Sequence, residues 1–178
     1  MDKNITKIAF GGGCHWCTEA IFQSTKGVER VEQGYVASIN ENNTFSEAVI
    51  VHYNMDWVKL KTLIEIHLLT HKSASNHSMR HKYRSAIYTF DDLQHQKVTD
   101  IMQVLQKDQD EKFVTEVLPF QAFKPSRKSI TNYYYNNPEK PFCETFINPK
   151  LKLLMERFSN DVNPEKLIHL EKETNNFE

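Results

Sequence analysis

The 178-residue chain has little of several features that define common protein classes. It contains three cysteines and five glycines, and it has no run of about 18 apolar residues that could cross a membrane. Three cysteines do not make the disulfide framework of a small secreted protein. The N-terminal residues are too short and polar for a signal peptide, so we expect a cytoplasmic protein with reduced thiols.

An excess of charge of one sign is also missing. The 22 Lys and Arg residues balance 23 Asp and Glu residues, which leaves a formal net charge of -1. We therefore do not expect a broad positive electrostatic field that would attract nucleic acid or a membrane, and we predict neither as a partner. The mean hydropathy of -0.59 is low, but 11% aromatic residues can supply core volume. These properties suit one domain with a tail.

Three of the five glycines, Gly11 to Gly13, lie together between a short apolar strand and a helical pattern. Cys14 follows them directly, and Cys17 comes three residues later. A thiol at a helix N-terminus meets exposed backbone N–H groups and the positive end of the helix dipole, which favour the thiolate. The sequence therefore predicts that Cys14 is a reactive cysteine.

A Cys-x-x-Cys pair is open to more than one interpretation. It could be half of a zinc site, but the only other cysteine, Cys143, lies far along the chain, and no histidine pair lies near the first two. A thioredoxin-like dithiol is a second possibility, and a catalytic thiol is the interpretation that we favour. A phosphate cradle is not expected, since the P-loop Lys-Ser/Thr is missing. We predict no metal and no cofactor.

Hydrophobic periodicity predicts strands and helices in the split βαβ order. The expected strands are 7–10, 28–36, 46–53, 83–90 and 112–118, and the expected helices are 18–25, 57–70 with Asp56 as N-cap, and one from Asp91 or Asp92 to Lys107. This order implies an α+β protein, with a two-layer, ferredoxin-like core, a mixed sheet and helices packed on one face.

The pattern weakens after Pro119, where aromatic residues are spread among polar residues and prolines. Such a segment is too aromatic for a disordered tail, so we expect it to wrap the core with long irregular structure. A final helix is predicted from Glu165 to Glu173. We therefore divide the chain into a main domain, residues 1–146, and a C-terminal helical extension, residues 147–178.

Seven short motifs occur in order along the main domain. They are GGCHWCTEA at 12–20, KGV at 26–28, GY at 34–35, EAVIVHY at 47–53, YRSAIY at 83–88, TEVLP at 115–119 and NPEKPFC at 137–143. In these motifs the chain resembles the peptide-methionine (S)-S-oxide reductases, which are the A-type methionine sulfoxide reductases. The resemblance implies an enzyme that reduces the S epimer of methionine sulfoxide, free or in oxidised proteins, with thioredoxin as its reductant.

The resemblance also implies roles for several residues. Cys14 would attack the sulfoxide sulfur and become a sulfenic acid. Glu47 matches the acid of the family, and burial among apolar strand residues would keep its carboxyl protonated and able to donate. Tyr83, and with it Tyr35, would hold the sulfoxide oxygen by hydrogen bonds.

A second thiol must then form an intramolecular disulfide with Cys14. Cys143 matches the C-terminal recycling cysteine of the family, on a Pro- and Asn-rich segment that we expect to be flexible. Cys17 lies on the same helical face as Cys14 and competes for this role. Alternatively, Cys17 is simply a small buried apolar residue.

Two departures from the family border the expected substrate site. His15 stands where the family has phenylalanine. In the family that phenylalanine and the tryptophan at Trp16 form the two walls of the pocket for the substrate methyl group, so one of these walls becomes polar and titratable here. Ser78 replaces an acidic residue, in a loop that reads SMRHK where the family has Asp-x-Gly-Thr-Gln. Either His77 and His81 supply the lost polar contacts, or the chain acts on a different substrate.

Other interpretations stay open from the residues alone. A diverged relative could use the same thiol as a redox sensor, or act on another sulfoxide or a disulfide. A metal-binding or interaction module without catalysis is a third class. Glu47 could be the solvent-facing member of an alternating strand, Tyr83 a packing aromatic, and Trp16 a core anchor.

Overall fold

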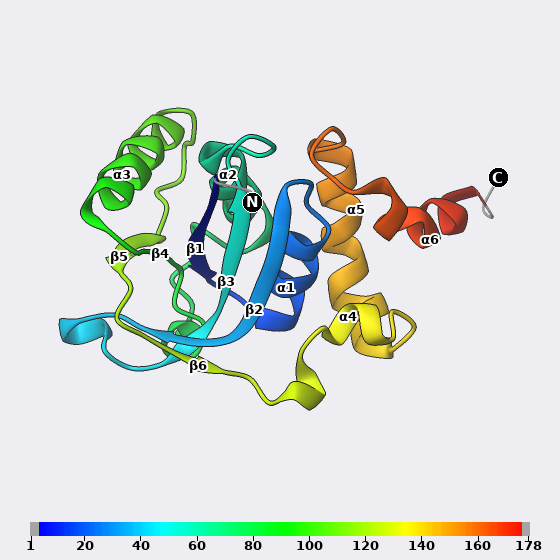
Figure 1. The fold of residues 1–178 in the computed structure, drawn as a ribbon, viewed down its shortest axis with the longest axis horizontal. Helices are drawn as coiled ribbons and strands as arrows, with labels where there is room; N and C mark the ends of the chain where they lie inside the picture. The colour runs from blue at the N-terminus through cyan, green and yellow to red at the C-terminus, as the bar shows by residue number, and fades with distance from the viewer. Residues whose placement is uncertain (1–3, 176–178) are drawn as a thin grey trace.

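A six-stranded mixed sheet forms the centre of the molecule (Figure 1). The structure is a computed structural model, and it describes residues 4–175. The strand order is β5-β4-β1-β3-β2-β6, with β4 and β5 parallel and the other neighbours antiparallel. The strands are β1 (Ile5–Gly11), β2 (Val28–Ala37), β3 (Ser46–Asn54), β4 (Ala86–Thr89), β5 (Glu116–Pro119) and β6 (Ala122–Pro125).

Six α-helices accompany the sheet in the described residues. They are α1 (His15–Gln23), α2 (Leu60–Thr70), α3 (Asp92–Lys107), α4 (Tyr133–Asn136), α5 (Asn148–Arg157) and α6 (Pro164–Asn175). Short 3₁₀ helices occupy Asn40–Asn42, Ser78–His81 and Lys128–Ile130, and a π-helix occupies Cys143–Ile147. None of the helices found within residues 4–175 is long and apolar enough to cross a membrane.

The inner strand order β4-β1-β3-β2 is that of a split βαβ unit, so the predicted α+β class is confirmed. Alternation along β1 explains the layering: Ile8 and Phe10 join the large core beneath the helices, while Ala9 belongs to a smaller cluster of buried residues. The smaller cluster includes Tyr88 and is partly covered by Phe120. Strand β5 follows α3 and extends the sheet beyond β4, and β6 extends it beyond β2.

Several predicted element boundaries are wrong by a few residues. Helix α1 begins at His15, three residues before the predicted start. Helix α2 begins at Leu60 with Lys59, and not Asp56, as its N-cap. The backbone N–H of Asp56 instead donates to the Asn54 side chain, which forms a turn ahead of the helix.

Two strands also begin later than predicted. Strand β4 starts at Ala86 rather than Tyr83, because the Tyr83 N–H donates to the Met79 carbonyl at the end of the 3₁₀ helix Ser78–His81. Strand β5 starts at Glu116 rather than Lys112. Tyr83 therefore lies on a loop, and its position depends on that loop rather than on the sheet.

The segment after Pro119 wraps the core as predicted, but it is more regular than the sequence indicated. It contains β6, α4, the π-helix and α5, and it ends in the helix that was predicted from Glu165. Figure 1 shows α4, α5 and α6 gathered beyond α1, at one end of the molecule. Leucines of α5 and α6 belong to the same core as β1, namely Leu151, Leu154, Leu167 and Leu170.

Candidate active site

The glycine turn places Cys14 at the start of α1. Strand β1 ends at Gly11, and Cys14 is the N-cap of the helix. Gly12 has φ +154, and a Cβ on it would lie 2.5 Å from the Cδ2 atom of His71. A side chain at this position would therefore be strained and would collide with an imidazole ring, whereas a Cβ on Gly13 would meet nothing within 4 Å. The turn brings the thiol close against α2.

The Cys14 thiolate is stabilised by the start of its own helix. The pKa of Cys14 is lowered, first by a hydrogen bond from the Cys17 thiol and then, against the effect of burial, by the backbone N–H groups of Trp16 and Cys17. The pKa of Cys17 is raised by the same hydrogen bond and by burial, so Cys17 stays a thiol that donates to its neighbour. Cys14 is thus prepared as a nucleophile.

Glu47 lies beside the first residue of α1. It comes from β3, where it pairs with Tyr35 of β2, and its side chain is buried with 8% of the residue exposed. Its Oε2 atom accepts the backbone N–H of His15 at 3.3 Å. The side chain therefore points inward, and the alternative of a solvent-facing strand residue does not describe it.

His15 is fully enclosed rather than forming an open pocket wall. Its Nδ1 donates to the Gly34 carbonyl at 2.8 Å, which leaves Nε2 facing Oε1 of Glu47 at 3.7 Å. The ring also meets Tyr35 edge-on, with centroids 5.2 Å apart. Only 3% of the residue is exposed. His15 thus joins β2 to the carboxyl of Glu47.

Trp16 belongs to an aromatic cluster formed with the C-terminal segment. Its ring stacks on Tyr133 of α4 at a centroid distance of 3.9 Å, and Phe142 meets it edge-on at 5.3 Å. The indole Nε1 is buried and has no hydrogen-bond partner in the part of the chain that the structure describes. Trp16 is half-buried, so it both packs and keeps an open edge.

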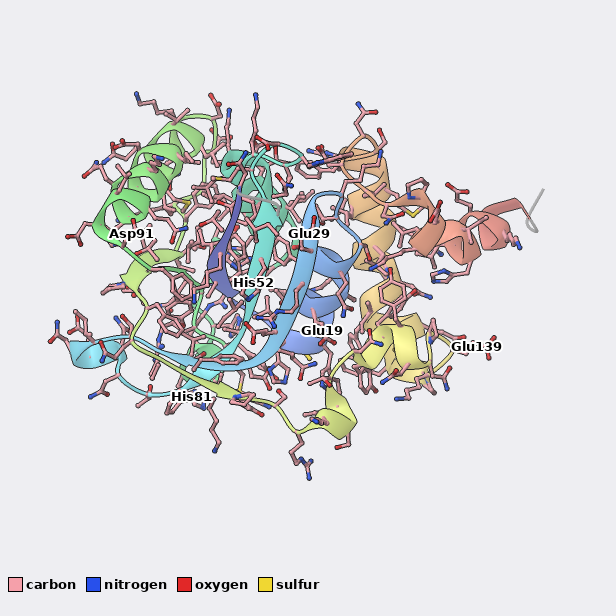
Figure 2. The ribbon with its side chains drawn as sticks, in the orientation of Figure 1. Glu19, Glu29, His52, His81, Asp91 and Glu139 are labelled. Atoms are coloured by element: carbon pink, nitrogen blue, oxygen red, sulfur yellow. The ribbon has the colours of Figure 1, made fainter. Side chains whose placement is uncertain are left out.

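Glu19, which no sequence pattern singled out, supports this cluster. Its two carboxylate oxygens accept the backbone N–H groups of Asn132 at 2.9 Å and Tyr133 at 3.0 Å. These bonds hold the start of α4 against α1, and burial raises the pKa of Glu19. Figure 2 labels Glu19 next to the α1 ribbon. Because its partners lie more than one hundred residues away, no local pattern could have revealed this role.

A cavity of about 470 Å³ opens beside Cys14. Four of the predicted site residues line it: Cys14, Cys17, Ser78 and Tyr83. The other lining residues are Gly12, Gly13, His71, Lys72, His77, Met79, Phe142, Phe146 and Lys150. His81 does not line this cavity; it is exposed, as Figure 2 shows, and faces a different hollow together with Arg84 and Glu116.

Arg80, which the sequence did not single out, ties the loop that carries Tyr83 to the glycine turn. Its guanidinium donates to the carbonyl oxygens of Gly12 at 2.8 Å and of Tyr83 at 2.9 Å. It also donates to the carbonyls of Lys72 and Ser75 in the preceding loop. The five donors of an Arg side chain make such a multiple clamp possible. Tyr83 is thereby fixed beside the cavity.

Cys143 is buried at the first residue of the π-helix, so it does not lie on the irregular segment that the sequence predicted. Burial raises the pKa of Cys143, so it stays a thiol. All three cysteines are free thiols. Within residues 4–175, no group of three or more His, Cys, Asp or Glu side chains is placed to hold a metal ion.

Comparison with known proteins now decides the family. The family model described as "Peptide methionine sulfoxide reductase" matches residues 6–162. The chain belongs to the peptide methionine sulfoxide reductase family. It is 33% identical over 165 residues to peptide methionine sulfoxide reductase MsrA of Acinetobacter baumannii (strain SDF), covering 85% of this chain and 94% of the relative. The resemblance inferred from the motifs is confirmed, and the chain is an oxidoreductase of methionine sulfoxide.

Solved structures share the fold at lower identity. Methionine sulfoxide reductase A of Corynebacterium diphtheriae aligns with a TM-score of 0.66 at 22% identity, over 76% of this chain and 76% of that one. Mxr1 from Saccharomyces cerevisiae, solved in complex with Trx2, aligns with a TM-score of 0.58 at 19% identity, over 74% of this chain and 85% of that one. These two proteins therefore share the fold of this chain.

Proposed function

We propose that this peptide methionine sulfoxide reductase acts on the S epimer of methionine sulfoxide, free or within proteins, with Cys14 as its nucleophile. The observation that carries the proposal is the pairing of a stabilised thiolate with a buried carboxyl. The Cys14 thiolate is held by its own helix N-terminus, and Glu47 contacts the backbone of the next residue. A nucleophile and an acid side by side are what sulfoxide reduction requires.

The reaction balances with these groups. The Cys14 thiolate attacks the sulfoxide sulfur, and Glu47 gives a proton to the oxygen as negative charge develops on it. The oxygen passes to the cysteine, which becomes a sulfenic acid, while the methionine thioether leaves. Tyr83 and Tyr35 are proposed to hold the oxygen by hydrogen bonds. Trp16 is proposed to contact the substrate methyl group with the open edge of its indole.

A second thiol then attacks the sulfenic acid, forms a disulfide with Cys14 and releases water. Both Cys17 and Cys143 stay candidates for this step. Cys17 already donates a hydrogen bond to Cys14, and Cys143 is buried in the same core cluster as Cys17. We propose thioredoxin as the reductant of that disulfide, and the solved complex of Mxr1 with Trx2 supports it. The cytoplasmic location, where thiols stay reduced, stays a prediction.

The test is to mix the protein with dithiothreitol and each epimer of methionine sulfoxide in turn. We expect loss of the S epimer alone, and loss of activity in Cys14→Ser. Glu47→Gln should lower kcat by about 10²- to 10⁴-fold, since it removes a general acid, whereas Glu41→Gln on the exposed hairpin should leave kcat unchanged. Absence of S-epimer turnover would refute the proposed substrate, and an active Cys14→Ser protein would refute the nucleophile.

A further inference from the structure

The cavity beside Cys14 carries charge of one sign. Two of its lining residues are lysines, Lys72 in the loop after α2 and Lys150 in the first turn of α5, and none is an aspartate or a glutamate. A third lysine, Lys82, lies next to the cavity, with its ammonium nitrogen 5.0 Å from the centroid of the Tyr83 ring. The whole chain has a formal net charge of only -1, so this concentration of cations is local.

Neither lining lysine is neutralised by a carboxylate. The ion pairs found in the described part of the chain use His15, Arg30, His52 and Lys61 as cations. Two carboxyl groups lie in the neighbourhood, Glu47 behind His15 and Glu144 on the exposed side of the π-helix, but neither lines the cavity. The positive charge of Lys150 also acts on the Cys17 thiol. It lowers the pKa of Cys17, whereas the hydrogen bond to Cys14 and burial raise that pKa.

The remainder of the cavity wall suits a peptide side chain rather than a small ion. Phe142 and Tyr83 are half-buried, while Met79 and Phe146 are 44% and 54% exposed. Ser78, which is uncharged, lines the same wall. An apolar surface therefore borders the nucleophile, and the two lysines that line the cavity, Lys72 and Lys150, form no ion pair within residues 4–175.

We propose that this reductase selects methionine sulfoxide with a carboxylate nearby, either on an acidic neighbouring residue of a peptide or on the sulfoxide residue itself. This inference rests on the proposed function of Cys14 and specifies its substrate class. Lys72 and Lys150 attract the carboxylate when the sulfoxide reaches Cys14. Two exposed lysines that attract one carboxylate give an expected preference of about 10-fold at low salt.

The experiment uses short peptides blocked at both ends, in which methionine sulfoxide is flanked by Glu, Gln or Lys, with dithiothreitol as the uncharged reductant. We expect kcat/KM to fall in the order Glu, Gln, Lys, with about 10-fold between the extremes at low ionic strength. About 1 M salt should abolish most of that difference, because it shortens the Debye length to about 3 Å. Equal rates for the Glu and Lys peptides at low salt, together with equal rates for the free-acid and amide substrates described below, would overturn the proposal.

Variants test the lysines directly through the ratio of Glu-peptide to Lys-peptide kcat/KM. The double substitution Lys72→Gln with Lys150→Gln should bring the ratio close to one, and Ser78→Asp should lower it by adding a negative charge to the wall. Lys61→Gln is the matched control, because Lys61 lies on α2 but is already paired with Glu65. A double variant that keeps the full ratio would overturn the proposal.

Two further substrates separate the sources of the carboxylate. N-acetyl-methionine sulfoxide carries its own carboxylate, and its methylamide does not. Faster turnover of the acid than of the amide identifies the residue's own carboxylate, and faster turnover of the Glu than of the Gln peptide identifies a neighbouring side chain. Either result supports the proposal. The absence of both preferences would overturn it. If no substrate is reduced, the Gln peptide included, then the proposed function itself fails.

Discussion

At the scale of single residues, the reactivity of Cys14 depends on a second cysteine. The sequence presented Cys17 either as a resolving thiol or as a small buried residue. In the structure it donates a hydrogen bond to the Cys14 sulfur, which is the largest influence on that thiol. Its place one helical turn along α1 makes this contact possible.

Replacing Cys17 should therefore change Cys14 even before any disulfide forms. Cys17→Ala should raise the pKa of Cys14, because it removes a hydrogen bond to the charged form of that thiol. Cys17→Ser keeps an O–H donor and should stay close to the wild type. The measurement is the pH dependence of iodoacetamide labelling at Cys14, followed by peptide mass spectrometry. Identical profiles for the alanine and serine variants would contradict this account.

The residues that the sequence identified and those it missed differ in how far away their partners lie. Cys14 could be predicted because its stabilising groups are within three residues, and Glu47 because it matched a motif on a strand. Arg80 and Glu19 could not be predicted: Arg80 binds Gly12, 68 residues away, and Glu19 binds Tyr133, 114 residues away. Such contacts exist only after the chain has folded.

At the scale of elements, the turn between β1 and α1 is fixed by backbone conformation. Gly12→Ala should lower the free energy of unfolding by about 1–3 kcal/mol, because the alanine would be strained and its Cβ would meet the His71 ring. Gly13→Ala is the matched control one residue later, where the space is open, and it should change the free energy by less than about 1 kcal/mol. Urea unfolding checks both values, and equal losses would contradict the assignment.

The end of α2 contributes two stacked imidazoles, His67 and His71, which pack beneath the glycine turn. His67 bonds to the Gly11 carbonyl at 2.7 Å, and His71 bonds to the Ser85 hydroxyl at 2.7 Å. Burial lowers the pKa of His71 to about 4 and that of His67 well below its usual range. Both rings are therefore neutral in the folded protein at neutral pH.

This histidine pair should make the protein sensitive to acid. The unfolded chain binds a proton at each histidine near pH 6.5, whereas folded His71 does so only near pH 4. Stability is thus complete above about pH 6.5 and is lost as the pH falls toward 4, by about 3 kcal/mol for His71 alone. His71→Gln should flatten the dependence of the free energy of unfolding on pH, measured with urea. His81→Gln, on an exposed residue, is the control that should keep the full slope.

At the scale of the whole molecule, the C-terminal helices share the core of the sheet. The sequence divided the chain at residue 146 into a main domain and a C-terminal helical extension, and that division stays a prediction. Leu151 and Leu154 of α5 and Leu167 and Leu170 of α6 are buried in the same cluster as Ile8 and Phe10. The family match likewise continues to residue 162. We therefore expect one cooperative folding unit.

A pair of substitutions in α6 tests this expectation. Leu167→Ala should lower the free energy of unfolding by about 2–5 kcal/mol, as for a large residue removed from a core. Ile168→Ala, at a residue that is 52% exposed, should cost less than about 1 kcal/mol. Both should unfold in a single urea transition when followed by tryptophan fluorescence and by circular dichroism. An unchanged stability for Leu167→Ala would show that α6 is an independent appendage.

The sequence by itself determined the family, through its resemblance in seven collinear motifs, and the order of strands and helices as far as Pro119, through the period of apolar residues. Both depend on residues that lie close together in the chain. Only the tertiary structure decided that Glu47 lies against His15, that Cys143 is buried in a helix, and that lysines from two elements share the cavity of Cys14. The physical reason is that burial, electrostatic field and long-range hydrogen bonds are properties of packed surfaces, which no local pattern encodes.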